Sequence, residues 1–388
     1  MLTNNIKFNN FKKKFNKASL KKKLNNFKKQ NLLKQYPLLK SFSKNYKYSY
    51  SKKQLLKLKK YQNYNLIGMG GSILGAEAIH QFLIKRVKKK FNFINNLEPK
   101  VNAQKKSVNI IISKSGETLE TISNLHVLQK KNNSNKNIFI TENKDSYLMK
   151  IAKKFESEIF EHKNFIGGRY SVLSEVGMLP AELMGLNEKK FKKFDKLVNN
   201  KKFLEYLILN VDFTIQLLRK GYTNSIILNY DTNSDNLFKW YQQLIAESLG
   251  KKSRGILPII STMPKDNHSL LQLYLDGPKN SFFTFFENIN EKSDYITPKN
   301  VLFEKKYLRA KKLKNIVNAQ KIATQKIFRK RKIPFRSFEI LQKDENSLGE
   351  LFCFFVLETI LLGKALKVNP FDQPSVELIK IETKKILS

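Results

Sequence analysis

The segment from Ser113 to Thr118 combines three hydroxyls, a lysine and a glycine directly after the apolar run Val108 to Ile112. A β-branched run that stops at small polar residues is typical of a buried strand that turns into a helix. The first turn of such a helix offers unpaired backbone N–H groups and the positive end of the helix dipole, which suit an anion. The segment therefore predicts a phosphate-binding loop. An ordinary strand–loop–helix junction with a hydroxyl cap is the alternative.

A second junction of this kind lies upstream, between Leu66 and Gly75. Its centre, Gly68 to Ser72, is rich in glycine and ends on a hydroxyl. Ligands of doubly wound sheets sit beyond the carboxyl ends of the strands, where both junctions are expected. The two loops could thus converge on one phosphorylated ligand.

Glu247 continues the apolar stripe of a helix predicted over 236–249, with Gly250 as its stop. The stripe consists of Leu237, Trp240, Tyr241 and Leu244. Three positions further along the same face, the Glu247 carboxylate should point inward, where it could act as a proton-shuttling base. A glutamate paired with a lysine at the rim of the core is the alternative.

Arg169 follows two glycines in a chain that has few arginines. Guanidinium can stabilise an oxyanion or hold a phosphate in ways that an ammonium does less well. The alternative is that Arg169 is simply a solvent-exposed residue of a flexible turn.

The four histidines do not fall at metal-ligand spacing, and the single cysteine, Cys353, lies in an apolar run. We therefore predict no catalytic metal and no intramolecular disulfide. His268 stands out because Asp266 could orient its ring, although Asp266 could instead cap a helix. Near the C-terminus, Gln373 and Lys380 would share one helical face, where surface roles are the usual case.

The composition limits the classes of function. The 388 residues carry a formal net charge of +41, which would ordinarily indicate nucleic acid. However, Lys outnumbers Arg by 65 to 8, and the lysines are spread along the whole chain. Arginine, which reads bases bidentately, is scarce, so we expect no specific nucleic-acid partner. No apolar run is long enough to cross a bilayer, and a cytoplasmic, reducing setting fits the cysteine usage.

The elements that position these residues follow a βαβ rhythm, which predicts parallel sheets covered by helices on both faces. We expect strands at 65–68, 108–113, 137–141, 225–230, 255–260 and 281–286, separated by helices. The rhythm restarts once, so two α/β units are expected. We place a basic helical N-terminal extension at 1–55, a first unit with the phosphate loop at 56–200, and a second unit with the C-terminal helix at 201–388.

The order of these motifs resembles the glucose-6-phosphate isomerase family. The resemblance covers about residues 60 to 385 and is carried by five motifs together with His268. The motifs are Gly68 to Ser72, Ser113 to Thr121, Gly167 to Ser171, Ala246 to Lys251 and Gln373 to Lys380. It implies two sugar-isomerase (SIS) domains, each a mainly parallel sheet flanked by helices. It also implies reversible conversion of glucose 6-phosphate to fructose 6-phosphate through a cis-enediol intermediate, without a cofactor.

The resemblance also implies roles for individual residues. Glu247 would move the proton, Arg169 would stabilise the enediolate, and His268 with Lys380 would assist ring opening. The phosphate would be received by residues of the first two motifs, Gly71, Ser72, Ser113, Lys114, Ser115 and Thr118. Gln373 and Glu120 would contact or position the substrate.

In this family the ring-opening histidine comes from the neighbouring subunit, so the resemblance implies a homodimer with shared sites. Action on mannose 6-phosphate as well is compatible with the sequence. A non-catalytic SIS-domain regulator that binds a sugar phosphate is the alternative function, and an RNA-associated protein is a third class.

Overall fold

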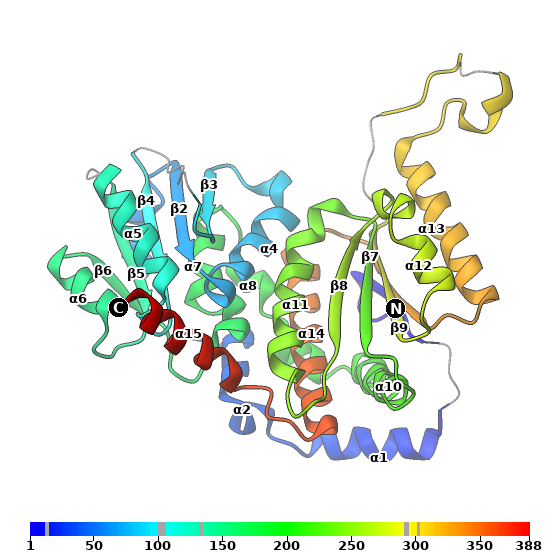
Figure 1. Ribbon diagram of the computed structural model, residues 1–388, viewed down its shortest axis with the longest axis horizontal. Helices are drawn as coiled ribbons and strands as arrows, with labels where there is room; N and C mark the ends of the chain where they lie inside the picture. Colours follow the sequence, from blue (N-terminus) through cyan, green and yellow to red (C-terminus); the bar gives the residue numbers. More distant parts are fainter. Residues whose placement is uncertain (12–14, 99–105, 132–134, 291–294, 301–302) are drawn as a thin grey trace.

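The computed structural model describes residues 1–388 except 12–14, 99–105, 132–134, 291–294 and 301–302. Two five-stranded sheets, each flanked by helices, lie side by side (Figure 1). The fold class is therefore α/β with two mainly parallel sheets, as predicted. Within the described residues, every helix is too short or too polar to span a lipid bilayer.

The first sheet is wholly parallel and has the strand order β3-β2-β4-β5-β6. Its strands are β2 (Asn63–Gly68), β3 (Lys90–Ile94), β4 (Val108–Ile112), β5 (Lys136–Thr141) and β6 (Glu158–Glu161). Successive apolar side chains alternate between its faces, so Leu66 packs in one core cluster and Ile67 in another. The elements around this sheet are α3 (Lys52–Leu58), η2 (Gly70–Ser72), α4 (Leu74–Phe82), η3 (Ile84–Arg86), α5 (Leu119–Lys131), α6 (Tyr147–Lys154), η4 (Gly168–Leu173) and α7 (Glu175–Leu183).

The second sheet has the order β1-β10-β9-β7-β8, in which only β1 is antiparallel. Its strands are β7 (Asn224–Asn229), β8 (Leu257–Thr262), β9 (Ser281–Asn288), β10 (Phe335–Ile340) and β1 (Ile6–Asn9). Its helical elements are η5 (Thr232–Ser234), α11 (Asp235–Leu249), η6 (Lys265–His268), α12 (Leu271–Asp276), η7 (Phe303–Leu308), α13 (Leu313–Lys330) and α14 (Glu345–Leu366). The connecting helices α8 (Glu188–Phe191), α9 (Phe194–Val198) and α10 (Lys201–Leu218) lead into this half of the molecule.

The N-terminal segment differs from a purely helical extension. Its helices are α1 (Lys17–Lys28), α2 (Leu32–Gln35) and η1 (Pro37–Phe42), but β1 joins the second sheet as an edge strand beside β10. Ile6 and Phe8 are buried there, so the segment is part of the core rather than an appendage. At the other end, α15 (Pro374–Leu387) lies beside the first sheet, on the α5 and α6 side of the view (Figure 1).

The two halves meet where α4 packs against α11. Gln81 at this junction accepts a hydrogen bond from the Asn236 amide at 2.7 Å and donates one to the Thr232 carbonyl at 3.2 Å. These two hydrogen bonds fix the N-terminal end of α11, and further along the helix Gln243 lies close to η2, since a Cβ built at Gly70 would stand 2.7 Å from its Nε2.

Candidate active site

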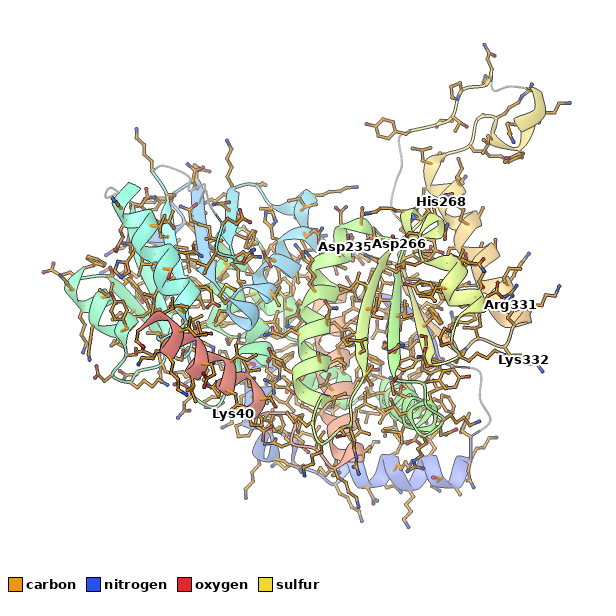
Figure 2. The ribbon with its side chains drawn as sticks, in the orientation of Figure 1. Lys40, Asp235, Asp266, His268, Arg331 and Lys332 are labelled. Carbon is orange, nitrogen blue, oxygen red and sulfur yellow. The ribbon has the colours of Figure 1, made fainter. Side chains whose placement is uncertain are left out.

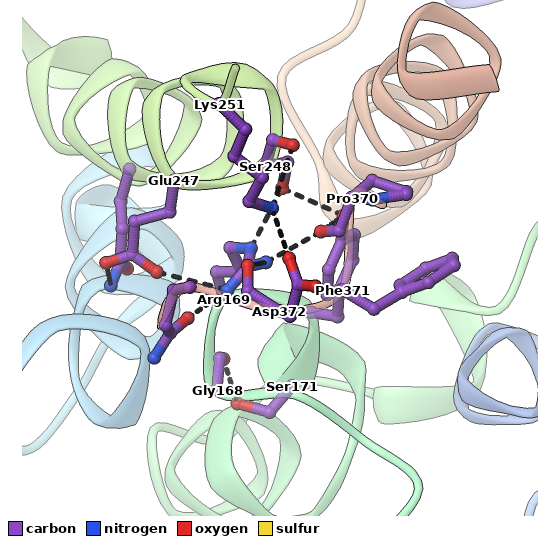
Figure 3. Close-up of polar contacts among 12 residues, drawn as sticks. Gly168, Arg169, Ser171, Glu247, Ser248, Lys251, Pro370, Phe371 and Asp372 are labelled. Atoms are coloured by element: carbon purple, nitrogen blue, oxygen red, sulfur yellow. Dashed lines mark hydrogen bonds and ion pairs between the residues drawn. The ribbon is translucent and has the colours of Figure 1, made fainter. Parts of the chain in front are cut away.

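Arg169 is positioned by a close contact between two glycine-containing turns. Gly71 lies in η2 after β2, and a Cβ built there would stand 2.2 Å from the carbonyl carbon of Gly168. Only a residue without a side chain permits this approach. The Ser171 hydroxyl reinforces the contact by donating to the Gly168 carbonyl at 2.7 Å. The start of η4 is thus fixed against η2, and the Arg169 side chain extends toward the end of α11 (Figure 3).

The Arg169 guanidinium is 2% exposed and joins three parts of the chain. It donates hydrogen bonds to Ser248 Oγ at 2.8 Å, Glu247 Oε2 at 3.2 Å, Gln373 Oε1, the Pro370 carbonyl at 2.6 Å and the Asp372 carbonyl at 3.0 Å. A planar guanidinium can serve these partners together, whereas an ammonium cannot match their directions. Arg169 is therefore a buried, fixed cation and not the solvent-exposed turn residue that was the alternative.

Glu247 lies in the last turn of α11, whose bounds agree within one residue with the predicted helix. One carboxylate oxygen faces Arg169, and the other accepts a hydrogen bond from Gln243 Nε2 at 2.9 Å. The side chain is 28% exposed, so a small ligand can still reach it. The carboxylate is thus both oriented and accessible, as a base acting on a bound molecule must be.

Gln243, Tyr170 and Ser248 also belong to this site but were not assigned a role from the sequence. Gln243 could have been found, because it precedes Glu247 by four residues and shares its helical face. The Tyr170 hydroxyl contacts Ser248 Oγ and donates to the Pro370 carbonyl, each at 2.9 Å. No local sequence signal reports that contact, since Tyr170 and Pro370 are 200 residues apart.

The loop from Ser113 to Thr118 has the features of an anion site. The Ser113 hydroxyl lies 2.8 Å from that of Thr118 and 3.4 Å from that of Ser115. Among the described hydrogen bonds, none is donated by the amides of Lys114, Ser115 or Thr118. These amides lie just before α5, so hydroxyls, open N–H groups and a helix N-terminus occur together.

The two glycine- or hydroxyl-rich junctions are neighbours, as predicted. Gly68 pairs with Ile112 in the register of β2 and β4, so both loops leave the sheet at the same level. The Cβ of Ser72 would lie 3.1 Å from a Cβ built at Gly68. Because η2 also touches Arg169 through Gly71, it connects the Ser113 loop with the Arg169–Glu247 pair.

Lys114 and Glu120 differ in their surroundings. The Lys114 ammonium donates to the Asn164 carbonyl at 2.8 Å and lies 3.4 Å from Glu142 Oε1. Glu120 is half-buried in the first turn of α5.

His268 is exposed in η6, beyond the carboxyl ends of the second sheet (Figure 2). This segment is tied to the start of α11, because Thr262 donates to Asp266 through its amide and contacts Asp235 through its hydroxyl. Asp235 and Glu247 are 12 residues apart in α11, or about 18 Å along the axis. The structure therefore does not bring His268 to Glu247 within one chain.

Lys380 likewise does not contact the Arg169 group. It lies on α15, is 60% exposed and pairs with Glu377 at 2.6 Å. Gln373, the residue that precedes this helix, does reach the site through its hydrogen bond with Arg169. The two ends of the C-terminal motif are thus separated in the structure.

The arrangement can transfer a proton next to an anchored anion. A carboxylate with an adjacent fixed cation and a loop with the features of an anion site both adjoin η2. In the described part of the chain, no group of three or more His, Cys, Asp or Glu side chains could hold a metal ion.

Comparisons with known proteins agree with this geometry. The family model described as phosphoglucose isomerase matches residues 29–260. The chain is 32% identical over 345 residues to "Glucose-6-phosphate isomerase" of Methanocaldococcus jannaschii, which covers 84% of this chain and 83% of that protein. It is 33% identical to the protein of the same name from Mycoplasmopsis synoviae, over 81% of this chain and 80% of that one.

A solved structure extends the likeness to the fold. The crystal structure of a glucose-6-phosphate isomerase from Chlamydia trachomatis superposes with a TM-score of 0.78 at 17% identity. The match covers 99% of this chain and 89% of that one. With the family model matching more than half of its length, the chain belongs to the phosphoglucose isomerase family.

Proposed function

We propose that this protein is an aldose–ketose isomerase that interconverts glucose 6-phosphate and fructose 6-phosphate, a step of glycolysis and gluconeogenesis. The observation that carries the proposal is the contact between Glu247 and Arg169 beside η2, the turn that adjoins the Ser113 loop. Family membership and the names of the relatives support the same substrate pair.

In the proposed mechanism, Glu247 removes the proton from C2 of the open-chain aldose, which gives a cis-enediolate with its charge on O1, and returns this proton to C1. The hydroxyl proton of O2 is transferred to O1, so that the C1 carbonyl becomes a hydroxyl and the C2 hydroxyl becomes the ketose carbonyl. The substrate carbonyl acidifies the transferred proton, so the reaction requires no cofactor. Arg169 supplies a fixed positive charge where the enediolate oxygen develops, which lowers the barrier because the cation is already oriented. Gln243 holds the carboxylate in place.

The phosphate group would bind at the opposite end of the substrate. We assign it to the hydroxyls of Ser72, Ser113, Ser115 and Thr118 and to the open amides at the start of α5, including that of Lys114. Gly71 permits the close approach of η2, and Gln373 and Glu120 are proposed to position the sugar chain.

Ring opening is assigned to His268 and Lys380. Because His268 lies at the far end of α11 from Glu247, we propose that it serves the site of a second subunit in a homodimer. Lys380 would approach the substrate through movement of the exposed helix α15. A cytoplasmic location is proposed with the metabolic role.

The test is turnover of fructose 6-phosphate by the purified protein, followed through a dehydrogenase that consumes glucose 6-phosphate. Glu247→Gln removes the base and should lower kcat by about 10² to 10⁴. Glu156→Gln, at an exposed position just after α6, is the matched control and should keep full activity. A Glu247→Gln variant as active as the control would end the proposal.

A further inference from the structure

Lys114 is part of the phosphate loop, but its ammonium is directed away from the loop hydroxyls. It donates to the Asn164 carbonyl at 2.8 Å and lies 3.4 Å from the Glu142 carboxylate. The Lys114 carbonyl also accepts a hydrogen bond from the Glu142 amide at 3.2 Å. Main chain and side chain of Lys114 are therefore both bound to neighbours outside its own loop.

These contacts connect three segments that leave the same edge of the first sheet. The Ser113 loop follows β4, Glu142 follows β5, and Asn164 follows β6. Asn164 is five residues before Arg169 and lies in the connection that delivers Arg169 to the site. A link from Lys114 to Asn164 thus joins the phosphate loop to the segment that carries the fixed cation.

Glu142 is suited to keep the lysine in this position. Its side chain is 14% exposed, and Lys144 pairs with its other oxygen at 2.8 Å. Burial alone would raise the pKa of Glu142, but the hydrogen bonds and charges of Lys144 and Lys114 outweigh burial and lower it. The carboxylate is therefore ionised at neutral pH and continuously attracts the Lys114 ammonium.

We propose that Lys114 and Glu142 are positioning residues, which set the distance between the phosphate loop and Arg169 through the Glu142–Lys114–Asn164 link. In this role the Lys114 ammonium does not contact the phosphate. The phosphate accepts a hydrogen bond only from the main-chain amide of Lys114. The inference rests on the proposed function. The distance between the phosphate loop and Arg169 matters only for a substrate whose phosphate is bound by the loop while its reacting carbons lie at Arg169.

The experiment compares Lys114→Met, Glu142→Gln and the double variant with Lys144→Met as the matched control. Lys144 also pairs with Glu142, but it is 51% exposed and lies outside the phosphate loop. The measurements are kcat and KM for fructose 6-phosphate, the calorimetric Kd of inorganic phosphate, and hydrogen–deuterium exchange of peptides covering 108–120 and 160–172.

We expect each single variant to lower kcat/KM about tenfold and the double variant to be no worse, since both changes remove one link. The Kd of inorganic phosphate should stay within about threefold, because this small anion needs the loop alone. Exchange should rise in both peptides, Lys144→Met should match the wild type, and Lys114→Arg should restore most activity.

The result that overturns the proposal is a Lys114→Met variant that binds phosphate at least tenfold more weakly while Glu142→Gln binds it as well as, or better than, wild type. Lys114 would then be a phosphate ligand that Glu142 restrains. Unchanged exchange in both peptides would also overturn the link. A wild-type protein without isomerase activity would count against the proposed function alone, because exchange and phosphate binding still test the link.

Discussion

At the scale of single residues, Arg169 is the most constrained side chain of the site. Its guanidinium is buried and donates to two carbonyls, a hydroxyl, an amide oxygen and the Glu247 carboxylate. Lysine keeps the charge but cannot serve these directions together. We expect Arg169→Lys to lower kcat by about 10² to 10³, as the loss of an oriented charge-stabilising donor does. Steady-state kinetics measure the change, and Arg254→Lys, at an exposed arginine, should leave kcat unaltered.

A second residue-scale prediction concerns His162, which is 1% exposed beside the phosphate loop. Burial, assisted by the charge of Lys114, lowers the pKa of His162 to about 4. Between pH of about 6.5 and 4, His162 is protonated in the unfolded chain but neutral in the folded protein. The free energy of unfolding therefore falls as the pH drops through this range. The loss from this group should approach about 3 kcal/mol, and it is absent above pH 7.

Urea unfolding at several pH values tests this contribution. Over that pH range, the wild type should lose about 3 kcal/mol more than His162→Gln, which has no titrating ring. His126→Gln, at an exposed position, should retain the wild-type dependence. Parallel pH profiles for wild type and His162→Gln would contradict the assignment.

Single residues also differ in how well the sequence predicts them. The orientation of Glu247 follows from helical periodicity, which is a local property of α11. The carbonyls of Pro370 and Asp372 could not be predicted as partners of Arg169. Every residue has a main-chain carbonyl, so the sequence does not indicate which of them accepts a hydrogen bond. Gly71 was identifiable as part of a turn, but its contact with Gly168 depends on how the chain returns after about 100 residues.

At the scale of elements, the two sheets arrange their first four parallel strands in the same order but differ at the edge where ligands bind. In the first sheet β2 lies between β3 and β4, and in the second β7 lies between β8 and β9, which creates a switch point at the carboxyl ends of these strands. The first sheet presents Ser113 and Thr118 there, whereas the second presents the carboxylates of Asp231 and Asp235. Carboxylates repel a phosphate, so only the first sheet is suited to one.

This difference gives an element-scale prediction. Thr118→Ala removes a hydroxyl from the phosphate loop and should raise KM for fructose 6-phosphate about tenfold, since a hydrogen bond to a charged group contributes about 1.5 kcal/mol. Thr232→Ala, in the loop after β7 of the second sheet, should leave KM within about twofold, because its side chain is exposed and lies outside the phosphate loop. Equal effects in a steady-state assay would refute the asymmetry.

The sequence predicted the interior strands β2, β4, β5, β7 and β9 and the edge strand β8, but not the interior strand β10, which carries Arg336, Ser337 and Glu339 among its apolar residues. β4 and β7 are short runs of buried β-branched residues, and such runs indicate strands without knowledge of their partners. The edge strands β1, β3 and β6 were not predicted, since they are short and carry charged or amide side chains. β1 pairs with β10 across more than 320 residues, a contact that no local pattern can report.

At the scale of the whole molecule, the proposed role of His268 in ring opening implies that each site is completed by a second subunit. The exposed His268 lies near the N-terminal end of α11, and Glu247 lies at the other, so one chain cannot use both on one substrate. In a dimer with twofold symmetry, the same surface of both subunits forms the interface. Each subunit can therefore supply a residue to the active site of the other.

Complementation between inactive subunits tests this sharing. Glu247→Gln and His268→Ala should each be nearly inactive alone. After random reassembly, half of the dimers would contain both variants, and each of these would have one intact site, which gives about a quarter of the wild-type activity. A mixture of Glu247→Gln with Arg169→Lys is the matched control, because these residues contact each other within one chain and no intact site can form. If the first mixture gains no more activity than the control, His268 acts within its own chain or has no part in ring opening.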